Sequence, residues 1–333
     1  MASLRNRIMS TLPITVLLVA MMLGGSAAQL SPTFYANTCA NVTSIVRGVL
    51  DQAQQSDARI GAKLIRVHFH DCMVNGCDGS LLLDDDAANG IDSEKDEAPN
   101  QTTDGYATVD DVKAALENVC PGVVSCADIL AIASQIGVSM AGGPTWQVPL
   151  GRRDSRTANA AGTTAVPSPF DTFDQLQKKF RDAGLDDATD LVALSGAHTF
   201  GRARCSTFNQ RLYDFNGQDG ATDPSLDATY LATLQQTCPE GGNANTLTNL
   251  DPSTPDTFDN NYFTNLQNKQ GLLATDQMLY STTGADTVSI VDRFAGSQSE
   301  FFDSFIQSMI NLGNVNVLTG SQGEIRTNCA RIN

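Results

Sequence analysis

The sequence predicts an all-α protein, and three observations lead to this prediction. Apolar residues recur at helical spacing through several long segments, as at Ile60, Leu64 and Val67. Most of these segments end at glycine or at a Gly-Pro break, which is where helices stop. Alternating apolar and polar residues, the pattern of a half-buried strand, are rare and short. We therefore expect a mostly helical protein with few short strands.

Six segments carry the helical pattern. In chain order they are ARIGAKLIRVHFHD, VDDVKAALENVCPG, CADILAIASQIGVSMAGGP, DTFDQLQKKFRDAGL, DATDLVALSGAHTFG and SEFFDSFIQSMINLGN. Three stretches rich in glycine, proline and asparagine, residues 84–104, 156–170 and 239–258, are expected to connect them as loops.

The chain opens with the features of a secretory leader. A start with two arginines precedes the apolar run TLPITVLLVAMMLGG, and small residues at Ser26 and Ala28 suit a cleavage site. The run is too short to span a membrane. We expect a signal peptide at residues 1–28 and a mature protein at residues 29–333, long enough for roughly two domains of about 150 residues or one unit with two lobes.

Composition excludes two classes of partner. Loss of the two leader arginines changes the formal net charge from −16 to about −18, and such an acidic surface argues against nucleic acid and anionic membranes. Because 41% of the residues are apolar and only 17% are charged, this acidity does not indicate disorder.

Eight cysteines follow the leader, and an even number in a secreted chain favours four disulfides. The pairing is open at this point because eight cysteines allow 105 connectivities. Zinc is the alternative, although the CxxC pairs that usually indicate it are absent.

The stretch RVHFHDCMVNGCDGS carries the strongest chemical signal. Arg66 and His70 lie four residues apart and share one helix face, whereas His68 points away from them and is expected to pack in the core. A base beside a fixed cation suits a reaction that removes a proton while negative charge develops on a neighbouring oxygen. Peroxide cleavage and hydrolysis both fit, so the pair alone does not decide.

Hard oxygen donors follow directly. Asp71, Asp78 and Ser80, with the carbonyls of a loop that a Cys72–Cys77 bridge would close, are the ligands that calcium prefers. The spacing does not match an EF-hand, and a solvated Asp-rich loop is the alternative.

A third histidine, His198, stands near the end of the apolar helix predicted for DLVALSGAHTFG. It either packs in the core or faces the imidazole of His70 across a gap. Two imidazoles on separate helices suit an iron porphyrin that is held from one side and open on the other.

These residues together resemble a known family. The motifs RVHFHDCMVNGCDGSLLLD, GVVSCADILAIAS, GGPTWQVPLGRRDS, DLVALSGAHTFG and TPDTFDNNYFTNL occur in this order with eight cysteines, as in the class III secretory plant haem peroxidases. The resemblance covers essentially the whole mature chain. It implies the plant-type haem peroxidase fold, with about ten or more helices in distal and proximal lobes and one haem b between them.

The resemblance assigns roles on both sides of the haem. On the distal side it implies that Arg66 and His70 cleave the peroxide, that Phe69 lies beside the haem, and that Asn100 accepts the Nδ1 proton of His70 and leaves Nε2 free as the base. Pro167 corresponds to the proline beside the exposed haem edge, where aromatic donors bind.

On the proximal side, the resemblance implies that His198 is the axial iron ligand and that Asp276 accepts its other N–H. Phe200 is implied as a further haem contact. A carboxylate in this position pushes the imidazole towards imidazolate.

Two calcium sites and a disulfide pattern are also implied by the resemblance. The distal site maps to Asp71, Val74, Gly76, Asp78 and Ser80, with Glu94 linked through water; the proximal site maps to Thr199, Asp251, Thr254, Thr257 and Asp259. The implied disulfides join Cys39 with Cys120, Cys72 with Cys77, Cys126 with Cys329, and Cys205 with Cys238.

The expected function is therefore a secreted, monomeric peroxidase of the extracellular space or cell wall, which reduces hydrogen peroxide and oxidises phenolic donors by one-electron steps. Two alternatives remain at this point. One is a secreted zinc hydrolase built on His68, His70 and Asp71; the other is a calcium-stabilised binding protein without activity. The sequence does not identify the physiological donor.

Overall fold

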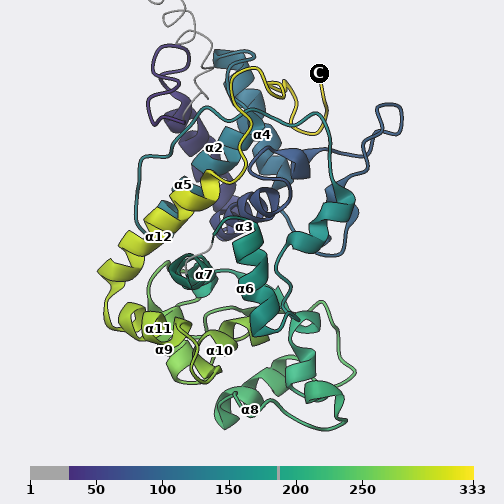
Figure 1. Cartoon of the computed structure of the whole chain (residues 1–333), viewed down its shortest axis with the longest axis vertical. Coiled ribbons are helices and arrows are strands. Elements are labelled where there is room, and N and C mark those ends of the chain that lie inside the picture. The colour runs from purple at the N-terminus through teal and green to yellow at the C-terminus, as the bar shows by residue number, and fades with distance from the viewer. Residues whose placement is uncertain (1–29, 186–187) are drawn as a thin grey trace, which may run out of the picture.

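The computed structural model describes residues 30–185 and 188–333, so the predicted leader lies outside the described residues. Within these ranges the fold is almost entirely helical, which confirms the all-α prediction (Figure 1). The α-helices are α2 (Val42–Ser56), α3 (Ile60–Met73), α4 (Tyr106–Val119), α5 (Cys126–Met140), α6 (Phe173–Asp182), α7 (Ala188–Ser195), α8 (Ala228–Thr237), α9 (Asn261–Gln267), α10 (Ala274–Ser281), α11 (Thr287–Gly296) and α12 (Gln298–Gly313).

One small sheet is present among the described residues. Strand β1 (Arg202–Arg204) pairs antiparallel with β2 (Leu247–Asn249), which places Ala203 opposite Thr248. This agrees with the expectation of few short strands. The predicted loops at 84–104 and 156–170 contain short 3-10 turns at Glu94–Asp96 and Ala160–Ala165.

Helix α3 lies between two apolar cores. Its Leu64 and Val67 belong to a core shared with α2, α4 and α5 in the upper part of the molecule (Figure 1). Ile65 and Met73 belong to a second core, shared with α6, α7 and α9 to α12. A helix that is packed on two sides holds its remaining face in a fixed orientation, and that face carries Arg66 and His70.

The second core is rich in phenylalanine. The ring of Phe301 lies 4.8 Å from that of Phe263 and stacks on Phe258 at 5.7 Å between centroids. Offset and edge-to-face ring pairs of this kind add about 0.5–1.5 kcal/mol each beyond the area they bury. This rigid core lies beneath the turn that presents His198.

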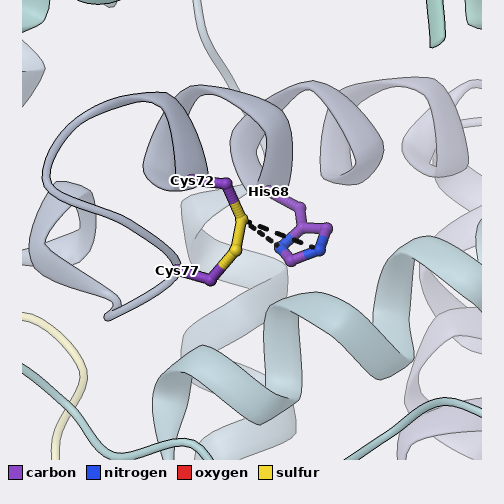
Figure 2. Close-up of side chains that lie close together, drawn as sticks. All are labelled: His68, Cys72 and Cys77. Carbon is purple, nitrogen blue, oxygen red and sulfur yellow. Dashed lines mark hydrogen bonds between the residues drawn. A yellow bond between two sulfur atoms is a disulfide. The ribbon is translucent and has the colours of Figure 1, made fainter. Parts of the chain in front are cut away.

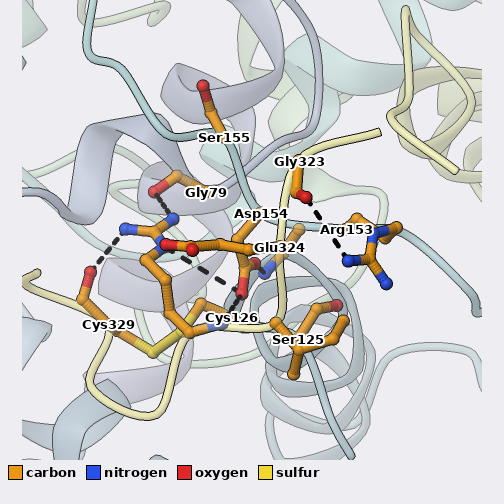
Figure 3. Close-up of polar contacts among 12 residues, drawn as sticks. Gly79, Ser125, Cys126, Arg153, Asp154, Ser155, Gly323, Glu324 and Cys329 are labelled. Atoms are coloured by element: carbon orange, nitrogen blue, oxygen red, sulfur yellow. Dashed lines mark hydrogen bonds and ion pairs between the residues drawn. A yellow bond between two sulfur atoms is a disulfide. The ribbon is translucent and has the colours of Figure 1, made fainter. Parts of the chain in front are cut away.

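All four disulfides form as the family resemblance implied: Cys39–Cys120, Cys72–Cys77, Cys126–Cys329 and Cys205–Cys238. The pair Cys126–Cys329 joins the last residues of the chain to the start of α5, close to Asp154 and Gly79 (Figure 3).

The same C-terminal segment is held by a fully buried arginine. Arg326 donates through its backbone N–H to Asp154 Oδ2 at 2.9 Å, and through its guanidinium to the carbonyls of Cys329 and Gly79. Gly79 lies in the loop that carries the predicted distal calcium ligands. The end of the chain therefore supports that loop directly.

None of the helices in the described ranges has both the length and the apolar character that a membrane crossing requires.

Candidate active site

Helix α3 presents the arginine and the histidine of the distal pair together. Arg66 Nε donates to His70 Nε2 at 3.2 Å, as residues four apart on one helix face can do. His68 points elsewhere, is 2% exposed, and lies against the sulfur of Cys72. The helical spacing therefore separated the two histidines correctly.

Asn100 fixes the tautomer of His70. Asn100 donates through Nδ2 to the carbonyl of Glu94 at 2.8 Å, so its Oδ1 is the atom that faces His70 Nδ1 at 2.7 Å. An amide oxygen only accepts, so Nδ1 carries the proton and Nε2 carries the lone pair. One detail differs from the expectation: Nε2 is not free, because it accepts the hydrogen bond from Arg66 Nε.

The loop that carries Asn100 also holds Arg66. The guanidinium donates from Nη1 to the carbonyl of Thr102 at 2.8 Å and from Nη2 to the Thr102 hydroxyl at 2.9 Å, with a longer bond to the carbonyl of Pro99 at 3.3 Å. These acceptors are neutral, so they orient the cation without neutralising it. Nothing in the sequence indicates the contact between Thr102 and Arg66, so Thr102 was not predicted.

The site keeps His70 neutral. Burial, together with the neighbouring charge of Arg66, lowers the pKa of His70 from 6.5 to about 3.

This shift predicts a pH dependence for the reaction with peroxide that the family resemblance implies. The base expected at His70 acts only when it is unprotonated, so the rate constant should stay level as the pH falls through 6.5 and should decline only as it approaches about 3. Stopped-flow measurement of the reaction with excess peroxide tests this. A fall to half the maximal rate near pH 6.5 would show that the environment of His70 is not the one described.

His198 lies just beyond a helix rather than within it. Helix α7 ends at Ser195, and His198 belongs to the 3-10 turn Gly196–Thr199. The turn packs tightly on the phenylalanine core, where a Cβ at position 196 would lie 2.6 Å from Phe301 and 2.8 Å from Phe263. Only glycine permits this approach, which sets the position of the imidazole two residues later.

Asp276 forms a hydrogen bond with the Nδ1 side of the His198 imidazole. His198 Nδ1 lies 2.7 Å from Asp276 Oδ1, and the carboxylate is buried. The same oxygen accepts the hydroxyl of Tyr262 at 3.0 Å, while Oδ2 accepts the backbone N–H of Leu273 at 3.1 Å. A donating Nδ1 leaves the lone pair on Nε2, and the imidazole is 38% exposed despite its buried partners. A neutral imidazole with an available Nε2 and a carboxylate partner fits an axial iron ligand.

The two phenylalanines implied beside the haem lie close to this region. Phe69 is partly buried, 6.1 Å from the His70 ring and 6.0 Å from Phe180. Phe200 is buried and lies 5.4 Å from Phe258. Phe200 belongs to the second core and Phe69 packs against it, so both rings are held in place and can contact an apolar macrocycle.

A cluster of buried oxygens lies behind His70. Asp71 and Asp78 receive backbone N–H groups from Gly79 and Ser80, each at 3.0 Å. Two polar atoms in this cluster, Ser80 Oγ and Glu94 Oε2, are buried without a partner among the described residues. Orphaned oxygens beside buried carboxylates are the donor set of a hard cation.

The electrostatics of this cluster support the same interpretation. Burial raises the pKa of Asp71 well above its usual value, and the negative charge of Asp78 raises it further. Burial also raises the pKa of Asp78, and that of Glu94 to about 7. Three acids that resist ionisation together need a nearby positive charge to be stable as carboxylates.

The backbone between these acids is arranged to offer carbonyls. Val74 and Gly76 are buried residues, and within the described part of the chain their carbonyls accept no backbone hydrogen bond. Gly76 has φ +119°, and a Cβ there would lie 2.6 Å from the carbonyl oxygen of Val315. Glycine is therefore required both by the backbone conformation and by the close approach.

A second oxygen cluster adjoins His198. The buried hydroxyl of Thr199 lies 3.2 Å from Asp259 Oδ1 and 3.5 Å from Asp251 Oδ2. Thr254 joins it through its backbone N–H, which donates to Asp251 Oδ1 at 3.0 Å. Thr257, the remaining residue that the resemblance implies here, is exposed.

Comparison with known proteins decides the family. Residues 46–297 match the protein family described as "Peroxidase". The chain belongs to the peroxidase family. Similar proteins include the "Lignin-forming anionic peroxidase" of Nicotiana tabacum, 62% identical over 96% of this chain and 97% of that protein, and "Peroxidase 15" of Ipomoea batatas, 62% identical over 92% and 94%. "Peroxidase C1B" of Armoracia rusticana is 49% identical over 92% of this chain and 88% of that protein.

The chain is thus a plant class III peroxidase enzyme, as the motifs indicated. Family membership implies a haem cofactor and a reaction of hydrogen peroxide with a donor substrate, and plant class III peroxidases are secreted. Because the relatives are named as peroxidases, the alternative of a binding protein without activity is not supported.

The zinc alternative has no support in this peroxidase. In the described part of the chain, the one group of three histidine, cysteine or acidic side chains whose ligand atoms all lie within 4.8 Å of one another is His68, Cys72 and Cys77 (Figure 2). Both sulfurs are consumed by a disulfide, whereas zinc binds thiolate. His70 is also committed to Asn100 and Arg66.

The segment around Pro167 is partly exposed in this peroxidase. The carbonyl of the preceding Val166 accepts Lys179 Nζ at 2.9 Å, and the backbone N–H of Ser168 donates to Asp171 Oδ2 at 2.7 Å. Phe170 is 59% exposed nearby in the sequence. The stretch is therefore held in place while it presents apolar surface to solvent.

Proposed function

We propose that this peroxidase is a secreted haem enzyme in which His198 holds the iron and Arg66 and His70 cleave hydrogen peroxide. The observation that carries the proposal is the chain of hydrogen bonds from Asn100 through His70 to Arg66. It presents an unprotonated Nε2 next to a cation, on a helix that is packed on both sides. His198, supported by Asp276, supplies the opposite imidazole.

Haem, when bound, supplies the iron and stores the oxidising equivalents. His70 Nε2 would accept the proton of one peroxide oxygen and return it to the other, which would leave as water. Arg66 stabilises the negative charge that develops on the departing oxygen. For this exchange Nε2 must be released from Arg66 Nε, and the bonds to Thr102 and Pro99 keep the guanidinium within reach.

Phenolic donors are proposed as the reducing substrates. The overall reaction balances as one hydrogen peroxide and two phenols giving two water molecules and two phenoxyl radicals. The partly exposed stretch from Pro167 to Phe170 offers apolar surface for an aromatic ring. The name of the tobacco relative, which is lignin-forming and anionic, supports phenolic donors for this chain, whose net charge is −16.

Two calcium ions are proposed to bind the two oxygen clusters. The distal ion would use Asp71, Val74, Gly76, Asp78 and Ser80, with Glu94 through water; the proximal ion would use Thr199, Asp251, Thr254, Thr257 and Asp259. The buried, unpartnered Ser80 Oγ and Glu94 Oε2 support the distal site.

We further propose cleavage of residues 1–28, export to the extracellular space or cell wall, and a monomeric enzyme at residues 29–333.

The test of this function is the visible spectrum of the purified protein before and after peroxide, followed by turnover of a phenol. The wild-type protein should show a haem band that changes with one equivalent of peroxide and returns when a phenol is added. His198→Ala should lose the wild-type band because the axial ligand is gone. A protein without a haem band, or a variant with an unchanged spectrum, would contradict the proposal.

A further inference from the structure

Tyr262 stands in the motif TPDTFDNNYFTNL and has no role in the function proposed so far. It lies in α9, is 2% exposed, and donates its hydroxyl to Asp276 Oδ1 at 3.0 Å. The same oxygen receives His198 Nδ1 at 2.7 Å. We propose that Tyr262 is a positioning residue that weakens the pull of Asp276 on the His198 proton and so sets how strongly His198 donates to iron. The inference rests on the proposed role of His198 as axial ligand.

Two donors on one carboxylate oxygen compete for the same negative charge. Charge-assisted hydrogen bonds are strong in a buried setting, so the bond from the Tyr262 hydroxyl reduces the negative charge on Asp276 Oδ1. The hydrogen bond from His198 Nδ1–H to that oxygen is weaker as a result. If the Tyr262 hydroxyl is removed, Asp276 Oδ1 accepts a side-chain hydrogen bond from His198 alone. The imidazole would then approach imidazolate more closely, which strengthens its bond to iron and favours the ferric state.

The carboxylate has a separate anchor, which makes this effect measurable. Asp276 lies in the first turn of α10, and its Oδ2 accepts the backbone N–H of Leu273 at 3.1 Å. Loss of the Tyr262 hydroxyl therefore should not release the carboxylate. The tyrosine ring lies 6.3 Å from the His198 ring in an edge-to-face arrangement, and phenylalanine would preserve that contact.

The alternative interpretation is that the bond from Tyr262 to Asp276 only stabilises the fold, since a buried tyrosine normally has an acceptor for its hydroxyl. That interpretation predicts a change in stability alone. The experiment therefore measures the bond between His198 and iron rather than turnover.

Tyr262→Phe should be compared with the wild type in the haem-loaded enzyme by resonance Raman and by potentiometry. We expect the iron–imidazole stretch of the ferrous enzyme to shift to higher frequency and the ferric/ferrous midpoint potential to become more negative. Asp276→Asn should shift both quantities in the opposite direction. Tyr230→Phe is the matched control, because Tyr230 is also buried and makes no described hydrogen bond to Asp276 or His198. It should shift neither quantity.

The outcomes separate the two proposals. If Tyr262→Phe matches the wild type while Asp276→Asn shifts both readouts, or if both variants shift in the same direction, the role of Tyr262 is wrong. If Asp276→Asn shifts neither readout, the proposed role of His198 fails instead. Should Tyr262→Phe fold poorly, 3-fluorotyrosine at position 262 keeps the shape and donates more strongly. It should lower the stretching frequency, and an unchanged or higher frequency would overturn the inference.

Discussion

Replacement of His70 by alanine is expected to slow the reaction with hydrogen peroxide by about 10²–10⁴-fold, the range for loss of a general acid–base group. The side chain supplies the unprotonated Nε2 beside Arg66, and no other histidine of α3 can take its place because His68 points into the core. Stopped-flow measurement of the second-order rate constant tests this.

The matched control is His68→Gln, since His68 lies on the same helix and is equally buried but touches neither Arg66 nor Asn100. Its rate constant should stay within about threefold of the wild type, because a packing change that leaves the pair intact removes no transition-state interaction. A His70→Ala enzyme with near-native peroxide reactivity would refute the assignment of the base. An equal loss in both variants would point to general damage to α3 instead.

Removal of calcium is expected to cost several kcal/mol of stability. An ion that binds only the folded state contributes about 4 kcal/mol when its concentration exceeds Kd about 1,000-fold. In the absence of the ion, Asp71, Asp78 and Glu94 repel one another in a buried site. Chelation with EGTA should therefore lower the unfolding temperature of the haem-loaded enzyme.

The stability lost when calcium is removed should depend on pH in a defined direction. Glu94 has its pKa raised from 4.5 to about 7 in the folded protein, so the folded state binds more protons than the unfolded state between these values. The stability of the chelated enzyme should thus fall as pH rises through this window, whereas the calcium-loaded enzyme should not show that fall. Thermal unfolding at two pH values with and without EGTA measures this. Equal unfolding temperatures with and without EGTA at both pH values would contradict the proposed sites.

The sequence alone predicted the parts of the site that depend on local geometry. Arg66 and His70 are four residues apart, and helical periodicity places them on one face and His68 on another. Asn100 and Asp276 act on histidines 30 and 78 residues away, so no local pattern reveals them. Their assignment depended on the resemblance to a family.

The sequence did not predict the contacts that are made only by tertiary packing. Thr102 reaches Arg66 because the 99–102 loop lies over α3, and Tyr262 reaches Asp276 because α9 packs beside α10. The sequence also placed His198 near the end of a helix, whereas α7 ends at Ser195 and His198 lies in the 3-10 turn that follows. Short helices such as α9 and α10, of 7 and 8 residues, carry too few turns for a clear periodic signal.

The bond from Arg326 to Gly79 joins positions 247 residues apart. Ribosomes add roughly 5–20 residues each second, so a nascent chain waits on the order of tens of seconds between making the glycine and making its arginine. Throughout that interval the loop at Gly79 lacks the hydrogen bond from the Arg326 guanidinium. This loop is consequently fully supported only after residue 326 has been synthesised, and the disulfide between Cys126 and Cys329 then fixes the two segments together.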